Sequence, residues 1–238
     1  MRQATPILLL LTLAFGCATG SHGGASGGKR FDFFSPAVAN NDDVDPWYPK
    51  VVEWQGRVSQ DKPEPLMVTR RSVANAENTG WLRLEMGAWR EEERRALAKR
   101  ILDWTQHQAR KHYKLDASND PVFDHWPTVG ELLVDNGGDC DGVDLIAYQL
   151  MREFGFPPDH LYRAIVRRNR DRANHMVTLW FETPDDPWVL DATGAMTFSM
   201  RHFSELPGWT PTKVFNDEKQ FLAVDRGTAP AAPAVAGH

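Results

Sequence analysis

The sequence predicts an α+β fold, with helices first along the chain and antiparallel strands after them. Apolar residues recur at helical spacing from Ala88 to Lys114 and again from Cys140 to Glu153. Three strand-like runs follow, from Leu161 to Val166, from His175 to Phe181 and from Trp188 to Leu190. Because short turn-forming segments separate these runs, we expect neighbouring strands to pair antiparallel.

Composition and charge narrow the class of protein. The chain has 238 residues, of which 42% are hydrophobic and 25% are charged, as in ordinary soluble globular proteins. The formal net charge of -5 argues against a general affinity for nucleic acid. We therefore expect no nucleic-acid partner. We also expect a monomer.

The N-terminus has the proportions of a secretory signal over residues 1–20. Arg2 provides a positive start and the apolar run from Ile7 to Phe15 is too short to span a bilayer. Gly16-Cys17 resembles the end of a bacterial lipoprotein signal, which would anchor the chain in the membrane through a lipidated Cys17. Cleavage near Ala18 by an ordinary signal peptidase is the alternative. Either way we expect export to the periplasm, with lipid anchoring to the outer membrane in the first case.

The mature chain then divides into four predicted parts. Residues 21–44, rich in Gly, Ser and Asn, are expected to form a flexible tether, interrupted by Phe31, Phe33 and Phe34. Residues 45–87 are expected to form an N-terminal extension with strand-like runs from Lys50 to Trp54 and from Leu66 to Thr69. Residues 88–226 form the predicted main domain, and the Ala/Pro-rich residues 227–238 are expected to be disordered.

Two further elements of the main domain are read from shorter patterns. The connector before Cys140 contains a short helical run from Val129 to Val134, and a last strand is expected from Phe221 to Asp225. The long helix from Ala88 carries acidic residues before basic ones, in the order that its dipole favours. We expect its charged side chains to form a solvated face.

The main domain is organised around a tight loop that breaks into a helix at Cys140. Gly137 and Gly138 allow a sharp turn, and Asp139 is a suitable N-cap. The free amides and positive dipole at a helix N-terminus favour a thiolate and could hold an oxyanion. The carboxylates of Asp139 and Asp141 oppose this effect if they lie close, so activation requires a basic partner.

The number of cysteines is a further argument for a functional role of Cys140. The chain has two cysteines, and Cys17 is either lipidated or removed on export, so Cys140 has no disulfide partner in the mature chain. An unpaired thiol in an oxidising compartment is a liability unless it is buried or used. A buried structural cysteine at the start of a core helix is the alternative to a nucleophile.

Among the eight histidines, His175 has the context expected of a base. It opens an apolar strand directly after a loop, and Asp191 closes the next strand sixteen residues later. A hairpin of this kind brings the start of one strand beside the end of the next. We therefore expect His175 and Asp191 to be neighbours facing the Cys140 helix, where a base and its orienting carboxylate would activate the thiol.

These segments resemble the bacterial transglutaminase-like cysteine peptidases, which belong to the wider papain/transglutaminase-like fold. The resemblance covers about Glu91 to Thr193. It is carried by these runs: Asp124-His125-Trp126-Pro127-Thr128, Glu131-Leu132-Leu133, Gly138-Asp139-Cys140-Asp141, His175-Met176-Val177 and Val189-Leu190-Asp191. It implies a catalytic cysteine at a helix N-terminus, packed on an antiparallel sheet that carries the histidine and the aspartate. Some members of the family are periplasmic proteases that clip surface adhesins.

By this resemblance Cys140 is the nucleophile, His175 the general base and Asp191 the orienting acid. The reaction is acyl transfer on a peptide or amide bond of a cell-envelope protein, and its chemistry requires no cofactor. The Cys140 amide and an upstream donor, for which the Trp126 indole is the candidate, would hold the oxyanion.

The resemblance also implies a candidate calcium site. Calcium-binding members use acidic residues flanking the cysteine, which here are Asp139 and Asp141. Gly142 departs from the family, where a second acid commonly follows, and calcium needs six or more oxygens. Helix capping is the alternative role for both aspartates.

Other functions remain open at this stage. The same site would act as a protein-glutamine transglutaminase if an amine replaced water as the acceptor, or as a deamidase if water attacked a glutamine acyl group. A non-enzymatic envelope lipoprotein using the scaffold to bind a partner is the third reading. Four arginines crowd the loop before His175 and could steer an acidic substrate, or form a solvated hairpin tip: Arg167, Arg168, Arg170 and Arg172.

Overall fold

The computed structural model describes residues 31–39, 41–61, 80–115 and 125–227, with side chains from residue 90 onward in the second helix. The predicted signal segment with Cys17, the strand-like run from Leu66 to Thr69 and residues 228–238 of the predicted tail lie outside the described residues. None of the helices in the described ranges is both long and apolar enough to cross a bilayer.

The prediction of an α+β fold with an antiparallel sheet is confirmed. The helices are α1 (Tyr48–Val58), α2 (Gly80–His112), α3 (Val129–Asp135) and α4 (Cys140–Glu153). The strands are β1 (Phe31–Pro36), β2 (Leu161–Arg168), β3 (Asn174–Trp180), β4 (Trp188–Leu190), β5 (Arg201–His202), β6 (Trp209–Phe215) and β7 (Gln220–Asp225).

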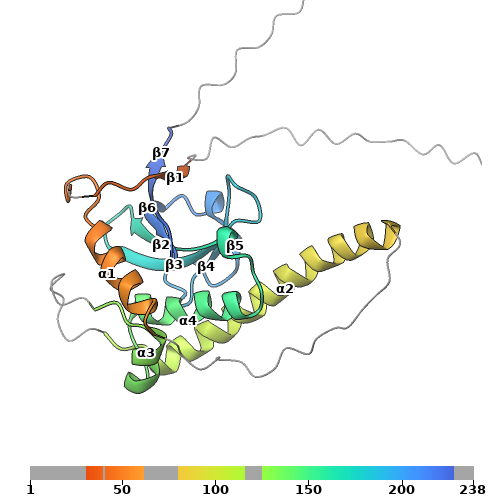
Figure 1. The fold of residues 1–238 in the computed structure, drawn as a ribbon, viewed down its shortest axis with the longest axis horizontal. Helices are drawn as coiled ribbons and strands as arrows, with labels where there is room; N and C mark the ends of the chain where they lie inside the picture. Colours follow the sequence, from red (N-terminus) through yellow and green to blue (C-terminus); the bar gives the residue numbers. More distant parts are fainter. Residues whose placement is uncertain (1–30, 40, 62–79, 116–124, 228–238) are drawn as a thin grey trace, which may run out of the picture.

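The strands form one antiparallel sheet in the order β1-β7-β6-β2-β3-β4-β5. Helix α4 packs on β3 and β2, and the long α2 packs on α4, so both helices lie on one side of the sheet (Figure 1). The hairpin β3–β4 pairs Thr178 with Leu190. This register brings the start of β3 beside the residues that follow β4.

The sheet separates two hydrophobic clusters because successive strand residues point to opposite faces. On the helix side, Met176 and Trp180 of β3 pack with residues of α1, α2 and α4. On the other side, Val177 and Leu179 pack with an aromatic group that includes Phe33. The central strands are therefore buried on both faces, which gives the site a rigid support.

The N-terminal part differs from the prediction. Phe31–Pro36 was expected to lie in a flexible tether, but it forms β1 and pairs with β7 at the edge of the sheet. Lys50 to Trp54 was expected to be a strand, but it lies in helix α1. Its β-branched residues suggested a strand, whereas Val51 and Trp54, three apart, form the buried face of a helix. This helix begins at Tyr48 and has Pro49 in its first turn.

Candidate active site

A strained loop sets the start of α4. Asn136 and Gly137 both have positive φ, of 53° and 143°. A Cβ on Gly137 would lie 2.1 Å from the carbonyl oxygen of His112, at the end of α2. Glycine is therefore required where the loop passes α2. The Asp139 side chain then caps α4 by accepting a hydrogen bond from the Asp141 amide at 3.3 Å, as predicted.

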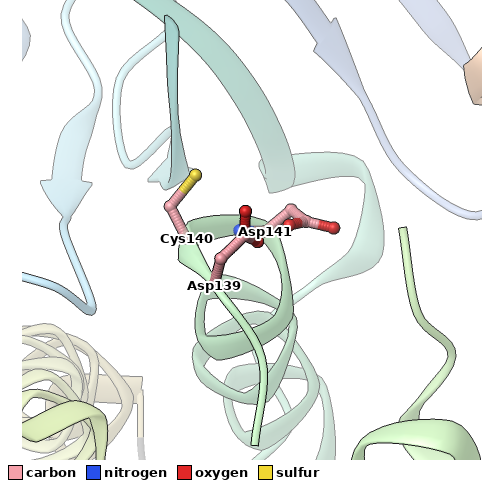
Figure 2. A group of neighbouring side chains, drawn as sticks. All are labelled: Asp139, Cys140 and Asp141. Carbon is pink, nitrogen blue, oxygen red and sulfur yellow. The ribbon is translucent and has the colours of Figure 1, made fainter. Parts of the chain in front are cut away.

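Cys140 is the first residue of α4 and is partly buried against the helix-side cluster. Figure 2 shows its sulfur pointing toward the strands, while the carboxylate of Asp141 points away from it. The backbone N–H of Met176, the residue directly after His175, lies close enough to the sulfur to lower the pKa of the thiol. The predicted nucleophile therefore lies at the start of β3.

The surroundings hold Cys140 as a thiol. Burial raises the pKa of Cys140 well above its usual range, and the carboxylates of Asp139 and Asp141 raise it further. The Met176 N–H acts in the opposite direction. The helix N-terminus was expected to favour a thiolate, and burial and the two flanking carboxylates act against it.

His175 and Asp191 form a buried pair, as the hairpin argument predicted. The Nε2 atom of His175 lies 2.9 Å from Oδ1 of Asp191, and both side chains are buried. Asp191 follows β4 directly, and His175 is the second residue of β3. The two residues come together because β3 and β4 pair antiparallel.

Asp191 is held by the turn that follows it. Its carboxylate accepts hydrogen bonds from the backbone amides of Thr193, Gly194, Met196 and Thr197. Burial alone would raise the pKa of Asp191, but the hydrogen bonds from His175 and from these amides lower it below its ordinary value. The carboxylate is therefore ionised and fixed in place.

The ionised carboxylate determines the tautomer of His175. Because a carboxylate only accepts hydrogen bonds, the ring hydrogen is assigned to Nε2. Nδ1 then keeps the lone pair of the neutral ring. The arrangement leaves Nδ1 as the nitrogen that can accept a proton.

Cys140 and His175 both lie near the start of β3. The Trp209 ring centroid is 5.7 Å from that of His175, and Met176, the next residue, packs in the cluster on the helix side of the sheet. The hydrogen bonds of the described residues join His175 to Asp191 and Thr193, and they include none between the Cys140 sulfur and the imidazole. Direct proton transfer therefore requires the sulfur and the ring to come into hydrogen-bond contact. Hydrogen bonds between catalytic groups often tighten only when substrate is bound.

A buried ion pair that the sequence reading missed fixes α4 to the sheet. Arg163 of β2 donates to the carboxylate of Asp144 at 2.8 Å and to the carbonyl oxygen of Asp141 at 2.6 Å. Thr178 donates to the other oxygen of Asp144 at 2.7 Å. These contacts join the first turns of α4 to β2 and β3. An arginine inside the apolar run of β2 is the signal in the sequence that could have pointed to this pair.

A second support for the site comes from α2. Gln106, which is buried, donates from its side-chain amide to the carbonyl oxygens of Asp191 and Thr197 at 2.9 and 3.2 Å. It therefore anchors both ends of the turn that holds the Asp191 carboxylate. The helical pattern of α2 gave no reason to select this glutamine.

Trp126, the candidate oxyanion donor, lies in an aromatic stack. Its ring centroid is 6.1 Å from that of Trp47 and 5.4 Å from that of Phe215, and its side chain is buried. These contacts belong to the core on the helix side of the sheet. The role of Trp126 in catalysis stays a prediction.

Asp139, Cys140 and Asp141 offer a group of atoms that could contribute to a metal site. One ligand atom from each residue lies within 4.8 Å of the others. Two carboxylate oxygens at such a separation can flank one calcium ion, whose bonds to oxygen are about 2.3–2.6 Å long. A Cβ at Gly142 would lie 2.8 Å from Cδ2 of Leu132, so a further acid there would require the Leu132 side chain to move.

An apolar groove lies elsewhere in the described residues. It has a volume of about 680 Å³, runs between α2, α3 and α4, and is lined mainly by apolar residues such as Ile101, Leu132 and Ile146. Cys140, His175 and Asp191 do not line it. The groove is therefore separate from the predicted chemistry.

Comparisons with known proteins give structural similarity only. No protein-family model and no curated protein matches the chain. Calcium-bound Legionella pneumophila LapG is similar at a TM-score of 0.45 and 22% identity, over 72% of this chain and 87% of that one. EGTA-treated LapG from the same organism gives a TM-score of 0.44 and 22% identity, over 72% of this chain and 84% of that one. Similarity of this extent does not fix an activity, so the function rests on the side chains.

Proposed function

We propose that this protein is an exported cysteine peptidase or amidase that uses Cys140, His175 and Asp191. The observation that carries the proposal is the buried contact of 2.9 Å between His175 and Asp191, with Cys140 close to the amide of the next residue, Met176. A base oriented by a fixed carboxylate, beside a thiol at a helix N-terminus, is the arrangement that thiol-dependent acyl transfer requires.

In the proposed reaction the Cys140 sulfur attacks the carbonyl carbon of a peptide or amide. Nδ1 of His175 takes the thiol proton and then delivers it to the leaving amine, as the carbon–nitrogen bond breaks and a thioester remains. Water then attacks the thioester, giving its proton to His175, and the acid product and the free thiol are released. Asp191 keeps the ring oriented and stabilises the imidazolium.

The raised pKa of Cys140 determines when the thiol proton leaves relative to the attack of the sulfur. A buried thiol flanked by two carboxylates is not ionised at neutral pH, so the proton leaves as the sulfur attacks. The amide of Cys140, the first residue of α4, is available in this scheme for the oxyanion, with Trp126 as the second proposed donor.

We further propose the setting that the sequence implies. The fold is papain/transglutaminase-like, the substrate is a protein of the cell envelope, and the enzyme is a periplasmic monomer. A lipidated Cys17 would hold it at the outer membrane. These statements rest on the family resemblance and on the signal-like N-terminus.

Calcium is proposed as a ligand of Asp139 and Asp141. The support is the closeness of their carboxylate oxygens and their oxygen chemistry, which suits calcium. A bound cation would neutralise the charges that raise the pKa of the neighbouring thiol. Calcium titration of the thermal unfolding midpoint, with Asp139→Asn as the comparison, tests this binding without reference to activity.

A non-enzymatic scaffold that binds a partner is the second candidate. The raised pKa of Cys140 favours it, as does the lack, among the described residues, of a hydrogen bond between its sulfur and the His175 ring. Transamidation by the same residues is a variant of the enzymatic proposal, because an amine can replace water in the last step.

The proposal is tested by comparing wild type with Cys140→Ala on isolated envelope proteins. We expect new protein termini, detected by mass spectrometry, with wild type only. Product mass separates hydrolysis, which gives fragments, from transamidation, which adds an amine to glutamine. Equal fragment patterns for both proteins would contradict a thiol peptidase.

A further inference from the structure

A basic cleft lies at the β2–β3 hairpin, beside His175. It has a volume of about 570 Å³, and its lining includes Arg168, Arg170 and Trp209. The Trp209 ring packs against the His175 ring at a centroid distance of 5.7 Å. The cleft therefore begins beside the proposed base.

Two loops form the walls of this cleft, and one residue joins them. Asn169, in the β2–β3 hairpin, donates through its backbone amide to the carbonyl oxygen of Gly208 at 2.9 Å. Its side-chain amide donates to the carbonyl oxygen of Pro207 at 3.0 Å, and its side-chain oxygen accepts from Thr210 at 2.7 Å. The walls are therefore held in place before any ligand arrives.

The cleft carries an excess of positive charge. Residues 167–172 contain four arginines and one aspartate. Asp171 accepts two hydrogen bonds from Arg168, at 2.9 and 2.8 Å, and lies 3.5 Å from Nε of Arg170. One carboxylate cannot neutralise both guanidinium groups. The Arg168 guanidinium also lies over the Trp209 ring at 5.7 Å, which orients its flat face beside the cleft.

We infer that this cleft binds an acidic side chain of the substrate, on the leaving-group side of the bond that is cut. The inference rests on the proposed function, because His175 must lie beside the leaving nitrogen to protonate it. The residues that follow the cut bond then run past His175 toward Trp209. A substrate carboxylate at this position would contact the guanidinium groups of Arg168 and Arg170.

The test is cleavage of a proteome-derived peptide library, with the cut sites read by mass spectrometry. We expect Asp and Glu to be enriched at one position after the cut bond with wild type. Arg168→Gln and Arg170→Gln should each lower this enrichment about two- to five-fold, the range expected for a partly exposed ion pair. Arg170→Glu should shift the preference toward Lys and Arg. Arg94→Gln, which alters an exposed arginine of α2 outside the cleft, should leave it unchanged.

Two results would overturn the inference. One is cleavage by wild type without acidic enrichment after the cut bond; the other is an enrichment that the arginine variants leave intact. If wild type cuts no peptide, the proposed function fails, and binding is then compared by fluorescence anisotropy. The probes are two labelled nonapeptide pools that differ only by Glu or Gln at the centre. Equal binding of both pools to wild type would overturn the acidic site as well.

Discussion

Nε2 of His175 lies 2.9 Å from Oδ1 of Asp191, at the end of a hairpin where both side chains are buried. The same carboxylate accepts amide hydrogen bonds from the turn that follows it. A carboxylate fixed by several donors does not reorient when the imidazole gains a proton. This contact is the part of the site on which the proposed chemistry depends most.

Asp191→Asn should separate the orienting role of the carboxylate from its size. Asparagine offers a single acceptor oxygen and turns an NH2 group toward backbone donors, so buried groups are left unpaired at about 1–3 kcal/mol each. The ring hydrogen of His175 is also no longer held at Nε2. We expect kcat to fall by about 10²–10⁴-fold in a peptide-cleavage assay. Gln106→Leu, which removes donors to the Asp191 and Thr197 carbonyl oxygens and leaves the carboxylate, should cost less activity.

Acid should destabilise the protein partly through Asp191. The native pKa of this carboxyl is lowered below its ordinary value of 3.8, so its contribution to the free energy of unfolding is complete above about pH 5. It is lost as pH falls through 3.8 toward the lower native pKa. Urea unfolding at about pH 6, 4 and 3 should therefore show the gap between wild type and Asp191→Asn narrowing as pH falls. A gap of constant size would show that the Asp191 carboxyl has the same pKa in the folded and unfolded states.

Asp139→Asn should make Cys140 more reactive at a given pH. The carboxylate of Asp139 raises the pKa of the thiol, and asparagine removes its charge while it can still cap α4. Iodoacetamide reacts with the thiolate, so its pH profile with Cys140, read by intact mass, should move to lower pH. Asp135→Asn, at an exposed position on α3, is the matched control and should leave the profile unchanged. Identical profiles for all three proteins would show that the charge of Asp139 does not control the reactivity of Cys140.

Arg163→Met should destabilise the fold far more than the same change at an exposed arginine. It leaves the buried carboxylate of Asp144 without its cation, at a cost of about 3–5 kcal/mol. Arg95→Met is the control, because Arg95 makes a similar pair with Glu182 at 2.9 Å but is half-exposed, and a loss of about 0–1 kcal/mol is expected. The free energy of unfolding from urea titration measures both. Equal losses would contradict a special role for the buried pair.

The elements with strong local signals could be predicted from sequence. The helix beginning at Cys140 and the strand Trp188–Leu190 have the predicted bounds, because a cap, a helical stripe and turn residues define them locally. The meeting of His175 and Asp191 also follows from local rules, since a hairpin fixes its own register. The position of Cys140 next to them depends on how α4 packs on β3, which local rules left undetermined.

Strand β6 shows why other parts were missed. Proline and lysine both argue against a central strand, yet Pro211 and Lys213 lie in one. The register of β6 against β2 shifts between Ile165 and Val166, and Val166 is the residue that pairs with Pro211. Lys213 is buried and lies 2.5 Å from the carboxylate of Asp45. The partner of Lys213 comes from a distant segment, so no local pattern reveals it. Helix α1 and strand β1 depend on distant partners in the same way.

The most direct measurement of the proposed chemistry is the mass of the intact protein after brief mixing with the peptide library and acid quenching. We expect adducts on wild type that digestion maps to Cys140 as thioesters. Cys140→Ala should form none, and His175→Gln should form them much more slowly. Turnover of peptides without any adduct on Cys140, or equal turnover by Cys140→Ala, would contradict covalent catalysis by this thiol.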